Sequence, residues 1–328
     1  MQTILDELRL DDGTPLRVVQ VEPPDETWRP VVSELLSHKP RPYDWHIECA
    51  FQGACGALQT RFTLGLLGDR AVCNIMTVER DGVGILGHVY TWPGERQRGI
   101  AKRVLARHLE DFRLRGGKVL VLGTAEGGHA AKLYADYGFR PVPGGPGGLM
   151  RWVNPADPNF EKAYFGDPIS FPVRGDWSHW PGIALLGARS TGIGIRSVAL
   201  GLRGVGLLEN AWCAWMARSY RNPDAQGMVL ENGAGAVVAV ATRVPDARWM
   251  NDIHLLDIFA HEDVTSDALT ALTEPLVDSN RRTQAIADPR DFAKIDVLNR
   301  LGFNREAVLP RQVRQDGILR DLWVYGIG

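Results

Sequence analysis

The chain has little cysteine, with four among its 328 residues. These four, Cys49, Cys55, Cys73 and Cys213, show neither the spacing of metal ligands nor the density of a disulfide scaffold. The sequence therefore predicts reduced thiols, which are typical of a reducing compartment, and gives no indication of a structural metal site.

Long apolar runs and a strong net charge are also lacking. The longest apolar run, Gly233–Ala241 (GAGAVVAVA), is about half of what a membrane-spanning helix needs. A formal net charge of −2 provides no general attraction for nucleic acid or anionic membranes. The first residues, MQTILDELRLDDG, are acidic where a signal peptide would be basic and apolar. We expect a cytoplasmic protein that binds neither membranes nor nucleic acid; its oligomeric state is not indicated.

What the chain does contain is a rough internal repeat. Its length favours two domains. The pattern of a strand, a helix that begins near a Trp and several further strands starts near Leu16 and again near Ile169. The segment 154–167 is rich in proline and aspartate and is predicted to be a linker. We therefore predict domains at 1–153 and 168–328.

One turn in the first copy has the composition of an anion site. In TWPGERQRGIAKRVL (Thr91–Leu105), a strand ends at Pro93 and a helix follows Gly99. The helix is predicted from apolar residues at three- and four-residue spacings, namely Ala101, Val104, Leu105, Leu109 and Phe112. The first N–H groups of a helix lack internal partners and carry positive potential, so a glycine there favours an anion.

Two motifs carry a resemblance to a known family. RQRGIA (Arg96–Ala101) resembles the Gln/Arg-x-x-Gly-x-Gly/Ala motif of the GNAT superfamily of N-acetyltransferases. KLYADYGFRPV, which follows the strand Lys118–Thr124, resembles the second motif of that superfamily, Leu-Tyr-x-x-x-Gly-Phe. The resemblance covers 1–153 well and 168–328 in outline. It implies an α/β fold with two tandem GNAT domains, each a mixed, mostly antiparallel central sheet flanked by helices.

The resemblance also implies a cosubstrate, acetyl-CoA or another acyl-CoA, and no metal. The turn would wrap the pyrophosphate, and the preceding strand would pair through its backbone with the pantetheine arm. The implied cofactor-binding residues are Val89, Tyr90, Thr91, Arg96, Gln97, Arg98, Gly99, Ile100, Ala101 and Tyr134.

For catalysis the resemblance assigns Tyr134 as the general acid that protonates the CoA thiolate. The general base stays open among His88, Glu126 and Glu79, because an amine nucleophile must lose a proton to a carboxylate, a histidine or a water that they hold. The segment Tyr43–Arg61 occupies the acceptor-binding stretch of the family, where Trp45, His46 and Glu48 could line a pocket.

The second copy departs from the family pattern. Its turn reads AHEDVTSDAL, in which Glu262, Asp263 and Asp267 would repel a pyrophosphate, and Leu298 stands where the first copy has Tyr134. We expect this degenerate half to bind no CoA and to act as a scaffold or as a wall of the acceptor pocket. Its tryptophans favour ordinary packing over an aromatic pocket.

These observations predict an N-acyltransferase that moves an acyl group, most simply acetyl, from CoA to the amine of a small molecule by direct attack. Three alternatives stay open. The chain could be an aminoacyl-tRNA-dependent transferase of the tandem GNAT type, although tRNA favours a basic face. It could be an acyl-CoA decarboxylase or a protein that loads acyl groups onto a carrier protein. It could also be a non-catalytic acyl-CoA sensor.

Overall fold

The computed structural model describes residues 2–168, 170–278, 280–315 and 317–328. Its contacts divide the chain into two compact units. The first unit comprises Met1–Val142, Gly147–Pro158 and Asp176–Pro181. The second comprises Pro143–Pro146, Asn159–Gly175 and Gly182–Gly328.

The first unit is built on an eight-stranded sheet of order β1-β2-β3-β4-β5-β6-β8-β7. All neighbours in it are antiparallel except β5 and β6, which are parallel. The elements are β1 (Gln2–Arg9), β2 (Pro15–Val21), α1 (Arg29–Leu35), α2 (Tyr43–Phe51), β3 (Gln59–Leu67), β4 (Arg70–Arg80), β5 (Val83–Thr91), η1 (Pro93–Glu95), α3 (Ile100–Leu114), β6 (Val119–Gly123), α4 (His129–Asp136), β7 (Arg140–Pro141) and β8 (Leu149–Val153).

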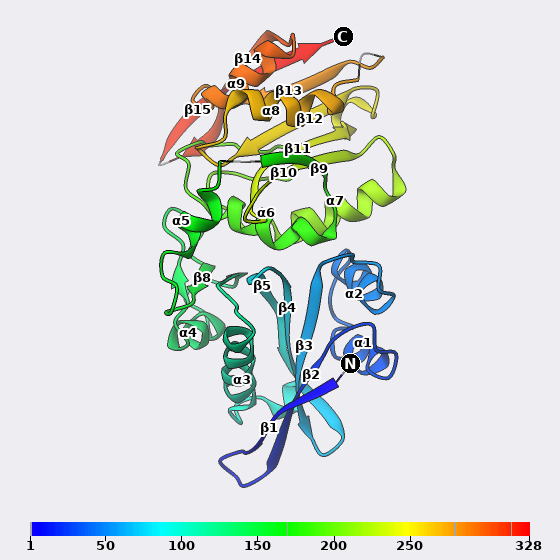
Figure 1. Ribbon diagram of the computed structural model, residues 1–328, viewed down its shortest axis with the longest axis vertical. Helices are drawn as coiled ribbons and strands as arrows, with labels where there is room; N and C mark the ends of the chain where they lie inside the picture. The colour runs from blue at the N-terminus through cyan, green and yellow to red at the C-terminus, as the bar shows by residue number, and fades with distance from the viewer. Residues whose placement is uncertain (1, 169, 279, 316) are drawn as a thin grey trace. The chain divides into compact units, whose positions relative to one another are not determined.

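Helices cover both faces of this sheet (Figure 1). Phe62 of β3 stacks on Phe51 of α2, with ring centroids 5.8 Å apart. The next residue, Thr63, lies 2.8 Å from Nδ1 of His108 on α3. Because successive side chains of a strand point to opposite faces, α2 and α3 lie on opposite sides of the sheet.

Strand β5 contains the irregularity that shapes the site. Asn74 of β4 pairs with Tyr90, but Met76 pairs with Gly87, so two residues of β5 face one residue of β4. This is a β-bulge, and its residue His88 has a φ of 50°. The carbonyl of His88 accepts a hydrogen bond of 2.8 Å from Nδ2 of the buried Asn74, which fixes the bulge.

The second unit repeats this topology. Its seven-stranded sheet has the order β14-β15-β13-β12-β11-β10-β9, which is the order of β7-β8-β6-β5-β4-β3-β2 in the first unit. Its parallel pair, β12 and β13, corresponds to β5 and β6 of the first unit. The elements are α5 (Phe160–Phe165), β9 (Ser170–Arg174), η2 (Trp177–His179), α6 (Trp180–Gly187), α7 (Glu209–Arg221), β10 (Gln226–Asn232), β11 (Val237–Pro245), η3 (Ala247–Trp249), β12 (His254–Ala260), α8 (Ser266–Thr273), η4 (Glu274–Leu276), β13 (Thr283–Ala287), α9 (Phe292–Arg300), β14 (Asn304–Gln315) and β15 (Ile318–Ile327), of which η2 and the first residues of α6 belong to the first unit.

The predicted fold class, two mixed and mostly antiparallel sheets flanked by helices, is therefore confirmed. Strand β1 was not predicted. The segment 154–167, expected to be a linker, contains α5, whose Phe160, Tyr164 and Phe165 are buried. All four cysteines are free thiols. Within the described ranges, no helix is long and apolar enough to cross a membrane.

The tryptophans of the second copy mostly pack in interiors, as predicted. Trp177, Trp180, Trp212 and Trp215 are at most 5% exposed. Trp249 differs, with 57% of its surface exposed.

Candidate functional site

The turn between β5 and α3 leaves its backbone donors free. Gly99 precedes α3 with a φ of 73°, a conformation that favours glycine, and no side chain caps the helix. The first N–H of α3 with a backbone acceptor is that of Arg103, which donates to the carbonyl of Gly99. Within the described part of the chain, the N–H groups from Gln97 to Lys102 have no such acceptor. A run of unpaired N–H groups at a helix N-terminus binds an anion.

An open strand edge lies beside this turn. The parallel pairing of β5 with β6 covers only Val83–Ile85, opposite Val119–Val121. From Leu86 to Thr91, β5 keeps β4 on one side, and no strand of the described residues pairs with its other side. Such an edge offers unpaired N–H and C=O groups to an extended ligand that carries amides of its own.

The two arginines of the turn differ in what they hold. Arg98 donates to carboxylates of Glu95 (2.5 Å) and Asp12 (2.7 Å), and its hydrogen bond with Asp12 raises the pKa of the guanidinium. Arg98 thus ties the turn to the β1–β2 loop. Arg96 is exposed, donates through Nε to the carbonyl of Thr91 at 3.0 Å, and lies over the ring of Tyr90. Within the described chain, no carboxylate pairs with the charge of the Arg96 guanidinium.

His88 lies on the α2 side of the sheet. It is 6% exposed, and its ring meets Tyr43 edge-on at 4.7 Å. Burial, aided by the charge of Lys39, lowers the pKa of His88 to about 3. Its Nε2 has no hydrogen-bond partner among the described residues. The imidazole is therefore neutral at physiological pH, and its Nε2 is available for a hydrogen bond to a ligand.

Tyr134 lies on the opposite side of the sheet. It is 6% exposed and belongs to the core that also contains Ile100 of α3, and Val89 of β5 packs against that core. Its ring lies 5.7 Å from that of Phe139. Tyr137, by contrast, donates its hydroxyl to the carbonyl of Lys102 at 2.9 Å, which ties α4 to α3. The bulge thus separates two candidates, with His88 on the α2 face and Tyr134 on the α3 face.

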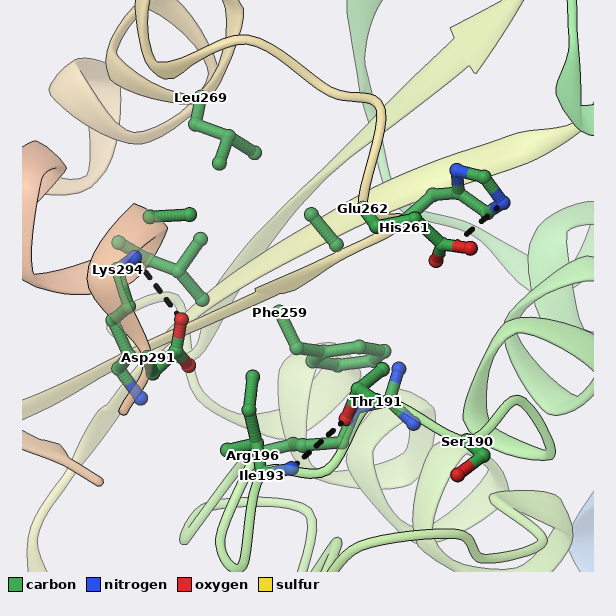
Figure 2. Close-up of a pocket in the computed structure, with 13 residues that line it drawn as sticks. Ser190, Thr191, Ile193, Arg196, Phe259, His261, Glu262, Leu269, Asp291 and Lys294 are labelled. Carbon is green, nitrogen blue, oxygen red and sulfur yellow. Dashed lines mark hydrogen bonds and ion pairs between the residues drawn. The ribbon is translucent and has the colours of Figure 1, made fainter. Parts of the chain in front are cut away.

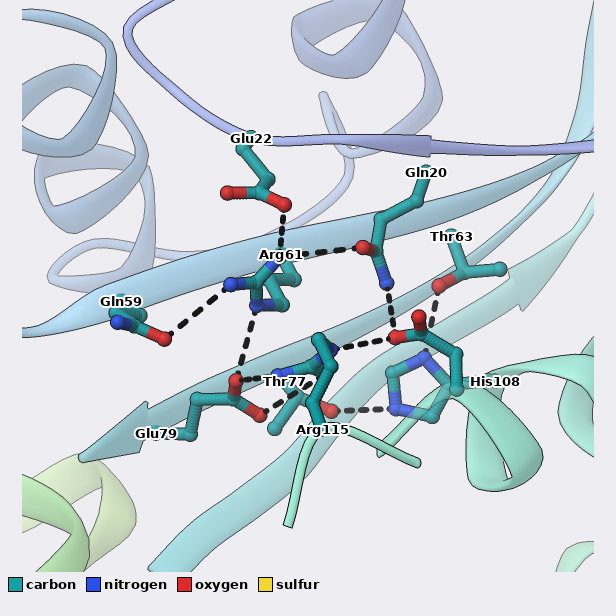
Figure 3. A network of polar contacts seen from close by, with 10 residues as sticks. Gln20, Glu22, Gln59, Arg61, Thr63, Thr77, Glu79, His108 and Arg115 are labelled. Atoms are coloured by element: carbon teal, nitrogen blue, oxygen red, sulfur yellow. Dashed lines mark hydrogen bonds and ion pairs between the residues drawn. The ribbon is translucent and has the colours of Figure 1, made fainter. Parts of the chain in front are cut away.

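The two carboxylate candidates for the base have contrasting surroundings. Glu126 is exposed and lies directly over Gly147, where an added Cβ would overlap its carboxyl. Glu79 is 3% exposed and accepts from Arg61 (2.9 Å) and from Arg115 in the network shown in Figure 3. Both of its oxygens are used by guanidinium groups, so Glu79 is placed to hold β3, β4 and α3 together.

The corresponding turn of the second unit is closed. Thr265 caps α8 by accepting from the N–H of Ala268 at 3.3 Å, and the N–H of Val264 donates to the carbonyl of His261. Leu298 is fully buried at the place of Tyr134. A helix whose end is capped by its own side chain has fewer free donors for a phosphate.

The two sheets share the order of seven strands, and in each unit a helix joins the two strands of the single parallel pair, α3 between β5 and β6 and α8 between β12 and β13. This topology decides the fold. Both units have the GNAT fold. No protein-family model matches the chain, and no curated protein matches it.

Solved structures similar to the chain include several acetyltransferases. An N-acetyltransferase from Staphylococcus aureus is 16% identical, with a TM-score of 0.41, over 48% of this chain and 98% of its own. A putative acetyltransferase from Salmonella typhimurium, solved with acetyl-CoA, is 16% identical over 48% and 92%, with a TM-score of 0.40. A ribosomal-protein-alanine N-acetyltransferase from Brucella melitensis is 18% identical over 48% and 98%, with a TM-score of 0.39. At these identities and TM-scores the likeness carries no argument about the activity or the substrate of this chain.

The first GNAT unit also contains a cavity that sequence reasoning missed. It has a volume of about 440 Å³ and lies between α1 and the end of β5, lined by Leu35, Trp92 and Gly94 among others. Glu34 lines it with a carboxylate that has no ion-pair partner in the described chain. The three residues expected to line an acceptor pocket differ in exposure. His46 is fully buried and Trp45 lies 5.1 Å from Trp177, whereas Glu48 is exposed.

Proposed function

We propose that this protein is an acyl-CoA-dependent N-acyltransferase, most simply an acetyltransferase, that acts on the amine of a small molecule. The observation that carries the proposal is the uncapped N-terminus of α3 beside the open edge of β5. Unpaired N–H groups suit the pyrophosphate of a CoA thioester, and an unpaired strand edge suits its amide-bearing arm.

In this proposal the backbone does most of the binding. The N–H groups from Gln97 to Ala101 face the phosphates, with Ile100 opening the helix, and the Arg96 guanidinium adds a charge-assisted donor. The backbone of Val89 and Thr91, on either side of Tyr90, pairs with the pantetheine amides. Gly99 has to be glycine because its φ of 73° is unfavourable for other residues.

The bound thioester would supply the acyl group. The amine nitrogen bonds to the acyl carbon as the carbon–sulfur bond breaks, so one proton must leave the nitrogen and one must reach the sulfur. Tyr134, on the α3 face with Val89, is proposed to protonate the sulfur. His88, on the other face, is proposed to accept a hydrogen bond from the amine. Because its pKa is about 3, the imidazole is neutral at pH 7 and can accept that hydrogen bond.

The cavity of about 440 Å³ supports a small amine as the acceptor. The unpaired carboxylate of Glu34 attracts an ammonium group, and the walls formed by Leu35 and Trp92 suit an apolar body. Glu126 is retained as an alternative base because it is exposed and pairs with no guanidinium group of the described residues. Acceptor identity is tested by an amine screen that measures the release of free thiol.

The test of the cosubstrate site is acetyl-CoA calorimetry on Gly99→Glu, whose carboxylate would occupy the phosphate position. Binding should be lost in a folded protein. Gly116→Ala is the matched control, because Gly116 ends the same helix with a φ of 86° and open space around it. It carries the same backbone strain, on the order of 1–3 kcal/mol, away from the turn. Unchanged acetyl-CoA affinity in folded Gly99→Glu would overturn the proposed site.

A further inference from the structure

The second unit contains a cavity for which the proposed function has no use. It has a volume of about 310 Å³, and its walls come from β12, α8, the start of α9 and the loop 190–196 (Figure 2). Leu269, Phe259 and Ile258 form an apolar part of the wall and are at most 4% exposed. The volume lies at the lower end for small-molecule sites and suits a ligand of the size of an amino acid.

Arg196 brings a buried positive charge to this cavity. It is 1% exposed, and its guanidinium lies 5.5 Å from the ring centroid of Phe259. Nη1 donates to the carbonyls of Gly187, Arg189 and Gly204, and Nη2 donates to that of Leu186. A guanidinium has five N–H groups, so one hydrogen of Nη2 and that of Nε have no acceptor in the described chain. No carboxylate of the described residues lies within ion-pair distance, and burial lowers the pKa of Arg196 to about 10.

Asp291 brings a buried carboxylate to the same cavity. It is 7% exposed and caps α9, where its Oδ1 accepts from the N–H of Lys294 at 3.2 Å. Its Oδ2 has no partner among the described residues, and burial raises the pKa of the carboxyl. The ammonium of Lys294 is used elsewhere, in an ion pair of 3.0 Å with Asp257.

Two opposite charges thus line one cavity without meeting each other. Burying a charge costs several kcal/mol per ion, and a direct ion pair would offset part of that cost. The other charged groups of the wall are already paired: Lys294 with Asp257, and Glu262 with Arg189 at 2.8 Å. A ligand with one charge would satisfy either Arg196 or Asp291 and leave the other unpaired.

We propose that this cavity binds a zwitterionic small molecule, a free α-amino acid with an apolar side chain. Its carboxylate lies against Arg196, its ammonium group lies against Asp291, and its side chain packs on Leu269 and Phe259. The site lies wholly within the second unit and does not depend on the function proposed for the first.

The test is calorimetry of the full chain with leucine, isoleucine, valine, methionine and phenylalanine, each titrated separately. At least one should bind with one site per chain. For leucine the matched probes are 4-methylpentanoate, which lacks the ammonium group, and 3-methylbutylamine, which lacks the carboxylate. Loss of a charged hydrogen-bonding partner should weaken binding about tenfold to hundredfold. If no amino acid binds, or if the single-charge probes bind as tightly, the proposal is wrong.

Three variants locate the site. Asp291→Asn keeps an N-cap residue for α9 and removes the charge, so it should weaken binding by a similar factor. Ala293→Trp should block the cavity, because Ala293 is exposed at its rim. Phe292→Trp is its control, since Phe292 is 75% exposed on the same helix and does not line the cavity. Binding that persists in a folded Ala293→Trp variant, or that is lost equally in Phe292→Trp, would place the ligand elsewhere.

Discussion

Replacing Glu79 by glutamine separates a structural carboxylate from a catalytic base. Glu79 is 3% exposed and Arg61 is 8% exposed, so the change removes a charge from a buried network. Breaking a buried ion pair by removing one partner typically costs about 3–5 kcal/mol. Here Arg61 keeps hydrogen bonds to Glu22 and Gln20, and Arg115 keeps Asp111 at 2.8 Å. We therefore expect a smaller loss of unfolding free energy, about 2–3 kcal/mol.

Urea denaturation followed by tryptophan fluorescence measures that loss. In a domain of this size it corresponds to a fall in the melting temperature of about 4–12 °C. Turnover at saturating substrate, below the new melting temperature, should keep its pH profile. Glu126→Gln is the control for the stability measurement alone, because loss of an exposed carboxylate should change stability by less than about 0.5 kcal/mol. A Glu79→Gln protein of unchanged stability that loses turnover would refute this reasoning and make Glu79 the base.

Two further predictions concern the first unit. Tyr134→Phe keeps the ring in the core and removes the hydroxyl, so acetyl-CoA affinity should hold while turnover falls about tenfold to a thousandfold; undiminished turnover would make Tyr134 a packing residue. Burial lowers the pKa values of His46, His88 and His108 to about 3, 3 and 4, below the 6.5 of the unfolded chain. Their contribution to stability is therefore full above pH 6.5 and is lost as the pH falls, by about 1.4 kcal/mol per pH unit for each imidazole. Urea titrations at pH 7, 6 and 5 check this; His108→Gln should flatten the dependence, and stability that is constant from pH 7 to 5 would contradict it.

Features defined by local patterns could be predicted from the sequence. The spacing of Val104, Leu105 and Phe112 indicated a buried helix face, and all three side chains are fully buried on α3. Gly99 drew attention at the helix start because a glycine there weakens an ordinary helix. Its φ of 73° is a conformation that favours glycine, which explains its place. Such signals involve neighbours in the chain, so one sequence suffices to find them.

Features made by distant residues could not be predicted. The sequence did not indicate that Arg98 pairs with Asp12, which lies in a loop 86 positions earlier. Strand β1, which ends just before that loop, was missed although the Asp-Asp-Gly turn at its end was a visible hairpin signal. Arg196 and Asp291 are similarly far apart, and neither belongs to a motif. Only folding brings such pairs together, and local composition does not encode which residues will meet.

The contribution of Asp176–Pro181 to the first unit gives a last prediction. This segment follows β9 in the chain, yet its Trp180 and Trp177 lie 5.0 and 5.3 Å from the ring of the buried His46. Burying a Trp contributes at most about 4–6 kcal/mol, so a fragment 1–158 should be several kcal/mol less stable than a fragment 1–181. The control is fragment 1–181 with Trp177→Ala and Trp180→Ala, which should behave as 1–158 does in urea denaturation. If 1–158 and 1–181 unfold at the same urea concentration, the segment contributes nothing to the stability of the first unit, and this reasoning is wrong.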